Sequence, residues 1–287
     1  MSVTDIPIRP AATVIVLRDT ESGPEVFLVR RHHAVAFMAG AHVFPGGRVD
    51  PGDHSADASW CDGVAEASTK LTGVAPDEAL AFHIATAREL FEEAGVLLAR
   101  QAAGQYVSLA GRADHDRFKV HRAELNAGRR TLREIVEMEN LRLALDALVH
   151  YAHWVTPPIE IRRFDTRFFV TRVPAEQTPA HDDHEATDSV WIKPADAIAA
   201  VGRGDIVLPP PTWASLRELQ RFPTVDAALH WAEKRTVYRR EPRVITAADG
   251  TRRIVLPGDP LLPEPEPVAF ETRFVLTGGR WSPETAA

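Results

Sequence analysis

Three glutamates in one short segment, Glu89, Glu92 and Glu93, are the residues of this chain best suited to chemistry. On a helix with about 3.6 residues per turn they share one face. Carboxylates spaced i,i+3 and i,i+4 repel one another, and the repulsion grows as water is excluded. Arg88 can reach Glu92, but one arginine cannot neutralise three acids. The face therefore predicts a bound divalent cation such as Mg²⁺, which prefers oxygen ligands. A solvated acidic surface is the alternative.

The helix that would carry these glutamates spans residues 77–94. Its apolar residues recur at helical spacing, and Gly95 follows where helices commonly end in a left-handed turn. The glutamates lie roughly opposite this apolar stripe. Upstream, a short strand at residues 41–44 runs into Gly46 and Gly47. Such a glycine pair marks a backbone that bends sharply or approaches another group closely.

The remaining elements indicate a mixed arrangement of strands and helices. Runs of β-branched residues predict strands at residues 12–17, 25–29, 161–170 and 188–192. Residues 112–150 and 212–222 have helical patterns instead. Because the strands and helices do not alternate strictly, an α+β or sandwich fold is favoured over a doubly wound parallel sheet.

Composition limits the partners of this protein. The chain has 287 residues, a formal net charge of −7 and an isoelectric point near 6.0. This charge disfavours a general affinity for nucleic acid or an anionic membrane, since both favour spread positive charge. Cys61 is the only cysteine, so a reducing compartment is expected. With neither a signal-peptide pattern nor an apolar stretch of membrane-spanning length, we expect a cytoplasmic protein whose oligomeric state stays open.

Residues 44–53 and 88–96 together resemble the two halves of the Nudix box. The first reads Phe-Pro-Gly-Gly-Arg-Val-Asp-Pro-Gly-Asp, and the second reads Arg-Glu-Leu-Phe-Glu-Glu-Ala-Gly-Val. The resemblance implies an α+β fold of the Nudix type, an α/β/α sandwich with a mixed sheet. It also implies a hydrolase that splits the diphosphate of a nucleoside diphosphate linked to another moiety, a small-molecule substrate.

The same resemblance assigns roles within the box. It implies Mg²⁺ or Mn²⁺ as the cofactor. The implied metal ligands are Glu89, Glu92 and Glu93. Arg88 would orient these glutamates as part of the catalytic set. Gly46 and Gly47 would let the backbone approach the metal or the phosphates.

Two departures from the common box matter. Asp53 stands where the box has glutamate, and 34 residues separate it from Arg88, where the box has seven. The insertion of 27 residues is tolerable because the cost of closing a loop grows only logarithmically with its length. We expect the inserted segment, residues 54–76, to pack beside the active site and to select the substrate. The distance between Asp53 and Arg88 depends on how the chain folds around this insertion.

A box split in this way resembles the Nudix motif 19 branch, which includes the peroxisomal coenzyme A diphosphatases. Three further segments support the likeness, at residues 154–157, 163–169 and 208–211. The branch implies cleavage of coenzyme A or acyl-coenzyme A to 3′,5′-ADP and the (acyl-)4′-phosphopantetheine. Two alternatives remain: a Nudix pyrophosphatase for NADH, ADP-ribose or a nucleotide sugar, and a nucleotide-binding regulator that does not cleave. The intact acids of the box favour an enzyme.

Other candidates lie outside the acidic helix. Four arginines could contact substrate phosphates, since guanidinium forks match phosphate oxygens: Arg30, Arg31, Arg163 and Arg167. Among these, Arg30 and Arg31 are the candidates for reading the 3′-phosphate of coenzyme A. Glu185, in the loop at residues 181–185, is a candidate general base, with an acidic surface turn as the alternative.

We expect two regions along the chain. Residues 10–211 would form the Nudix domain, interrupted by the insertion at 54–76 and by a helical insertion at about 112–150. Residues 212–287 would form a C-terminal extension packed on the same domain.

Overall fold

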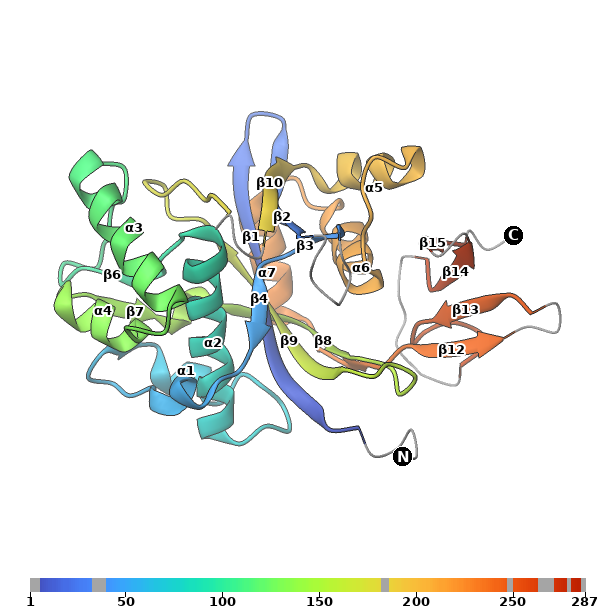
Figure 1. Ribbon diagram of the computed structural model, residues 1–287, viewed down its shortest axis with the longest axis horizontal. Coiled ribbons are helices and arrows are strands. Elements are labelled where there is room, and N and C mark those ends of the chain that lie inside the picture. Colours follow the sequence, from blue (N-terminus) through green and yellow to red (C-terminus); the bar gives the residue numbers. More distant parts are fainter. Residues whose placement is uncertain are drawn as a thin grey trace.

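The main sheet is mixed and forms the centre of the molecule (Figure 1). The computed structural model describes residues 6–32, 40–181, 186–246, 250–262, 271–277 and 280–284. The strand order is β10 (Ala186–Ile192), β2 (Gly23–Arg31), β1 (Ile8–Thr20), β9 (Arg163–Arg172), β8 (Val149–Val155) and β11 (Arg239–Arg240). The short strands β3 (His42–Val43) and β4 (Gly46–Arg48) pair with β2 and β1. β1 runs parallel to β9 and antiparallel to β2, which makes the sheet mixed.

Both faces of the main sheet are buried. Along β1, Val14 and Val16 belong to one hydrophobic cluster, whereas Ile15 and Leu17 belong to another. This alternation follows from the two-residue period of a strand. α2 (Pro76–Ala94) packs into the first cluster, and α6 (Pro210–Leu219) and α7 (Val225–Lys234) pack into the second. The result is a sheet with helices on both faces, and the expected α+β sandwich is confirmed.

α2 matches the helix predicted from the sequence. It begins with Pro76 in its first turn, and Asp77 and Glu78 follow where acids interact favourably with the helix N-terminus. It ends at Gly95, which has the left-handed φ of 68° and whose N–H bonds to the Phe91 carbonyl. Most of the helix is buried, so packing as well as propensity determines its position.

A second core lies beside α2. A three-stranded sheet joins β5 (Cys61–Asp62), β7 (Arg142–Ala144) and β6 (Ala99–Arg100). Around it lie α1 (Val64–Ala67), α3 (Arg112–Asn126), α4 (Leu132–Met138) and the short 3₁₀ helices η2 (Pro51–Ser55) and η3 (Leu145–Ala147). Trp60, Phe118 and Ile135 belong to the same buried cluster. Residues 54–76 are therefore part of a core that also includes residues 97–145.

The prediction of helix throughout residues 112–150 is correct for α3 and α4 and wrong beyond them. From Arg142 the backbone pairs with distant strands: Leu143 donates to the Trp60 carbonyl and Ala144 to the Leu98 carbonyl. The apolar residues 141, 145 and 148 fit helical spacing, but Leu145 is buried in η3, and Leu141 and Leu148 are buried just before β7 and just before β8. Periodicity alone does not distinguish such a buried irregular segment from a helix.

The C-terminal part first returns to the main sheet and then leaves it. After α5 (Pro194–Arg203), α6 and α7, strand β11 pairs with β8 at the sheet edge. Four antiparallel strands follow, β12 (Arg243–Thr246), β13 (Arg252–Val255), β14 (Arg273–Thr277) and β15 (Arg280–Pro283). Trp213 of α6 meets Phe274 of this second sheet edge-on, and Arg217 pairs with Glu271. Among the described residues, no helix is long and apolar enough to cross a membrane.

Candidate active site

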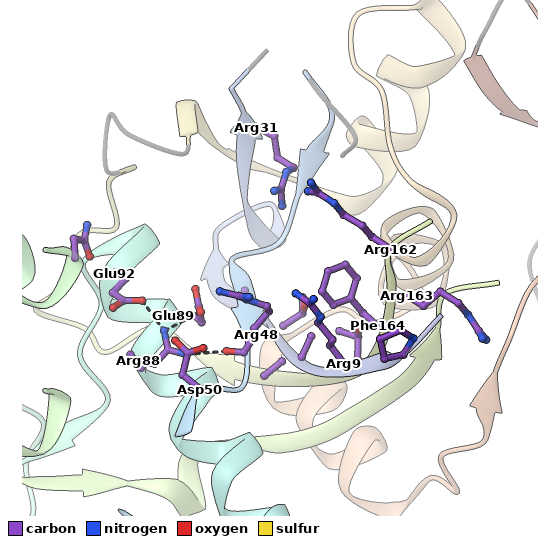
Figure 2. Close-up of a pocket in the computed structure, with 18 of the residues that line it drawn as sticks. Arg9, Arg31, Arg48, Asp50, Arg88, Glu89, Glu92, Arg162, Arg163 and Phe164 are labelled. Atoms are coloured by element: carbon purple, nitrogen blue, oxygen red, sulfur yellow. Dashed lines mark hydrogen bonds and ion pairs between the residues drawn. The ribbon is translucent and has the colours of Figure 1, made fainter. Parts of the chain in front are cut away.

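A cleft of about 1140 Å³ opens where β1 and β4 approach α2. One wall carries Arg88, Glu89 and Glu92 of α2. Figure 2 shows arginines and Phe164 along the opposite wall. The cleft is thus acidic at one end and basic at the other.

Arg88 links the acids of the box through one guanidinium. Its Nε and Nη2 donate to the two carboxylate oxygens of Asp53, at 2.9 and 3.0 Å. Its Nη1 donates to both Glu89 and Glu92 at 2.8 Å, and Nη2 also donates to the Arg48 carbonyl at 2.8 Å. Burial opposes the charge, yet the hydrogen bond with Asp53 and the nearby glutamates raise the pKa of Arg88 above its ordinary value. Arg88 therefore orients the glutamates.

Asp53 remains in contact with Arg88 despite the insertion between them. Its side chain is only 3% exposed and forms a bidentate pair with the guanidinium. The same carboxylate accepts the Asp50 N–H at 2.8 Å, which caps the 3₁₀ helix η2. The 34 intervening residues leave the two ends of the segment together.

The two glycines of β4 allow glutamate side chains to lie against the backbone. Gly46 donates its N–H to Glu93 at 2.9 Å. A Cβ at Gly47 would overlap the carboxylate of Glu89, so only glycine leaves room for that group. Strand β4 and helix α2 therefore contact each other through these two glycines and the two glutamates.

The acidic end of the cleft fits a divalent cation by its chemistry. Asp50, Glu89 and Glu92 line it, and they offer the oxygen donors that Mg²⁺ and Mn²⁺ prefer. Burial raises the pKa of Glu92, and the Arg88 charge opposes that rise. No group of three or more ligands in the described ranges is arranged to hold a metal by itself. Mg²⁺ is commonly held by one or two carboxylates plus water and phosphates, so a complete protein cage is not required.

Comparison with known proteins identifies the family of this chain. A family model described as the NUDT19 Nudix domain matches residues 63–222. The acyl-coenzyme A diphosphatase NUDT19 of Homo sapiens is 31% identical over 283 residues, covering 83% of this chain and 72% of the relative. This chain belongs to the NUDT19 Nudix family. The Xenopus laevis protein of the same name is 26% identical over 305 residues, covering 94% of this chain and 79% of the relative.

A solved structure supports the fold assignment. The crystal structure of a Nudix hydrolase from Alicyclobacillus acidocaldarius superposes with a TM-score of 0.65 at 27% identity, covering 79% of this chain and 97% of that chain. The Nudix fold is confirmed. Family membership also confirms the expected enzyme class, a Nudix hydrolase acting on diphosphates.

The candidate arginines occupy different places around the Nudix cleft. Arg31 and Arg163 line it, whereas Arg30 and Arg167 are not among the lining residues. Arg163 donates to Glu241 at 2.6 Å and to the Thr156 carbonyl. Figure 2 shows its guanidinium pointing away from the cleft.

Arg167 and the candidate base are separate from the lining. Arg167 is 7% exposed, lies 3.3 Å from Asp165 and sits over the Phe82 ring. Arg167 therefore lies on strand β9 and packs against α2, where it stabilises the fold. Glu185 lies outside the described residues. Nearby, His181 is within hydrogen-bond distance of Ser189, at 3.0 Å.

Several cleft residues were not predicted from the sequence. Arg9, Arg48, Arg162 and Phe164 all line the cleft. Arg48 follows the glycine pair inside the box, and this position was an available signal. Arg9 and Arg162 are far apart in the sequence, and neither belongs to a recognisable motif.

Residues 54–76 were expected to pack beside the active site and to select the substrate, and they pack against α2, the helix that carries the acids. None of these residues lines the cleft. Trp60, Cys61 and Leu71 are buried, because their apolar side chains pack into the cores beside and beneath α2. Leu125, Asn126 and Gly128, at and after the end of α3, line the cleft instead.

Proposed function

We propose that this enzyme hydrolyses the diphosphate of coenzyme A or an acyl-coenzyme A, with Mg²⁺ or Mn²⁺, to 3′,5′-ADP and the (acyl-)4′-phosphopantetheine. The observation that carries the proposal is the cleft itself: carboxylates held by Arg88 at one end and arginines at the other. This arrangement suits a substrate that has a diphosphate and further negative charge. Relatives that match most of the chain are named acyl-coenzyme A diphosphatases, which supports the same substrate class.

The acidic end would hold the metal. Glu89 and Glu92 are its best-placed ligands, because both line the cleft and are oriented by the same Arg88 nitrogen. Glu93, the third ligand implied by the box, accepts a hydrogen bond from the Gly46 N–H and is not among the residues that line the cleft. When bound, the cation would offset charge on the diphosphate oxygens and lower the pKa of a coordinated water.

The side chains of the enzyme would do the remaining work by positioning and charge. Cleavage of a phosphoric anhydride requires water in line with phosphorus and positive charge where negative charge develops. Arg48 lies beside Glu89 and can bind a phosphate oxygen (Figure 2). Glu92 is also our candidate for accepting the proton of the attacking water if it is not bound to the cation, because its carboxylate lines the cleft. Glu185 remains the alternative base.

The acidic helix alone would serve any Nudix substrate, so the substrate must be tested directly. We would compare kcat/KM for coenzyme A, acetyl-coenzyme A, NADH, ADP-ribose and a nucleotide sugar, with Mg²⁺ and with Mn²⁺, and identify products by mass spectrometry. Coenzyme A and its acyl derivative should be the best substrates, and EDTA should abolish turnover. Much higher efficiency with NADH or a nucleotide sugar would reject the substrate and leave the diphosphatase assignment standing.

A further inference from the structure

Four arginine side chains that line the cleft have no carboxylate partner in the described ranges. They are Arg9, Arg31, Arg48 and Arg162. The Nε of Arg31 is also buried without a hydrogen-bond partner. By contrast, the adjacent Arg163 pairs with Glu241, and most other arginines of the described chain pair with an acid. In a chain with a net charge of −7, this concentration of uncompensated positive charge requires an explanation.

These arginines come from separate elements and converge on the same end of the cleft. Arg9 lies on β1 opposite Phe164 of the parallel strand β9. Arg162 precedes β9, and Arg31 ends β2. Figure 2 shows Arg162 extending toward Arg31, and Arg9 rising beside Phe164. Arg48 lies between this group and Glu89, so it is the arginine nearest the acidic end.

Like charges placed together in a cleft repel one another, and the repulsion is reduced when an anion binds among them. A diphosphate at the acidic end would already be balanced by the metal and by Arg48. A phosphate monoester carries a charge of about −1.5 to −2 near neutral pH and presents three acceptor oxygens. Several guanidinium forks can bind it at once, whereas a neutral ribose or sugar would leave the arginines uncompensated.

We propose that Arg9, Arg31 and Arg162 bind a phosphate monoester of the substrate that is separate from the diphosphate being cleaved. The substrate class would be a nucleoside 5′-diphosphate derivative with a second phosphate on its ribose. This inference rests on the proposed function, since coenzyme A carries such a phosphate. It retains Arg31 from the sequence expectation and assigns the rest of the site to Arg9 and Arg162, because Arg30 does not line the cleft.

The test compares two substrates that differ only in the monoester. We would measure kcat/KM for coenzyme A and 3′-dephospho-coenzyme A with the wild type, Arg9→Ala, Arg162→Ala and the double variant. In each single variant, kcat/KM for coenzyme A should fall about ten- to hundredfold, and kcat/KM for the dephospho form should change little. The reason is that only coenzyme A loses a charge-assisted contact. Arg48→Ala should impair both substrates equally. Arg203→Ala, an exposed site on α5, is the control and should match the wild type.

A binding experiment separates this inference from the proposed function. Adenosine 3′,5′-bisphosphate and AMP would be titrated into the full chain by calorimetry. The wild type should bind the bisphosphate at least about tenfold more tightly than AMP. The Arg9→Ala/Arg162→Ala variant should bind the two ligands with similar affinity. Equal losses for both coenzyme A forms, with no preference for the bisphosphate, would overturn the inference even if coenzyme A is the substrate. A preserved preference without coenzyme A cleavage would instead overturn only the proposed function.

Discussion

Arg88 determines the orientation of the acidic residues, because one guanidinium contacts Asp53, Glu89 and Glu92 at the same time. The repulsion among carboxylates on one helix face is thereby reduced but not removed. Glu89 and Glu92 still line the cleft, where we propose that a divalent cation binds. At the scale of single residues, we therefore predict that removing the charge of one of these glutamates impairs catalysis.

Replacing Glu92 with Gln keeps the size of the side chain and removes its charge. If Glu92 binds the cation or acts as the base, kcat should fall by about 10²- to 10⁴-fold. The Tm should change little, because Gln can still accept from Arg88. Steady-state kinetics with Mg²⁺ and a thermal melt would measure both. Glu134→Gln, at the exposed capping box of α4, is the control and should retain full activity. If kcat fell less than about threefold in both Glu92→Gln and Glu89→Gln, a solvated acidic face would be favoured over a metal site.

At the scale of elements, the active site depends on how closely β4 approaches α2. Gly47 faces the Glu89 carboxylate, and Gly46 donates its N–H to Glu93. The glycine pair therefore fixes the distance between a strand and a helix that are separated by the insertion. A side chain on β4 would move the glutamates away from their positions.

Gly47→Ala tests this contact. The added methyl group overlaps the Glu89 carboxylate, so that group must shift. A displacement of about 1 Å at a catalytic group can cost on the order of 10²-fold in rate, and we expect kcat/KM to fall by at least about tenfold. Gly52→Ala is the matched control, since its Cβ would meet nothing within 4 Å. Equal activity of the two variants would contradict the role that we give to the close approach.

The inserted segment supports the fold and does not contact the cleft. Trp60 is 2% exposed, and its indole N–H bonds to the Ser55 carbonyl at 3.0 Å. Trp60→Ala should lower the free energy of unfolding by about 3–5 kcal/mol through lost burial and a cavity. The ratio of kcat/KM for coenzyme A and NADH should stay unchanged. Urea denaturation and paired kinetics would check this, with Lys70→Ala as an exposed control. A changed substrate ratio at constant stability would show that the insertion selects the substrate.

At the scale of the whole molecule, the charge distribution is uneven. The chain is acidic overall, yet four arginines that have no carboxylate partner in the described ranges line the cleft, namely Arg9, Arg31, Arg48 and Arg162. Away from the cleft, a cluster of basic groups is buried beneath the sheet around Phe169. It includes His83 and His150, whose rings lie against Phe169. Burial lowers the pKa of His83 to about 4 and that of His150 to about 3. Both are therefore neutral in the folded protein near pH 7.

These histidines predict that stability falls in mild acid. Their ordinary pKa is 6.5, so below that pH the unfolded chain binds protons that the folded chain does not. The neutral histidines contribute fully to the free energy of unfolding above pH 6.5, and this contribution is lost as the pH falls toward 4. Each histidine should add a slope of about 1.4 kcal/mol per pH unit in that window. Urea denaturation at pH 7.5, 6.0 and 5.0 would measure the slope.

His83→Leu should make the dependence shallower, because one of the two groups that titrate only in the unfolded chain is removed. His115→Leu, at an exposed position of α3, should leave the slope as in the wild type. An identical slope for His83→Leu and the wild type would show that the acid sensitivity has another origin.

The sequence by itself determined what depends on local spacing. The period of apolar residues before Gly95 located α2 almost to its ends, and the same period placed the three glutamates on one helix. Local composition also located β1, β2 and β9. The box residues then identified the family. All of these signals act within a few residues, where the geometry of helices and strands fixes which side chains are neighbours.

Only the tertiary structure decided the contacts between distant segments. It brought Asp53 to Arg88 across the insertion, and it converted residues 142–150 from an expected helix into strands and a turn by pairing them with distant backbone. The convergence of Arg9 and Arg162 follows from the parallel pairing of β1 with β9, which are more than a hundred residues apart in the chain. Such pairings depend on burial across the whole sheet, and residue spacing within one segment does not encode them.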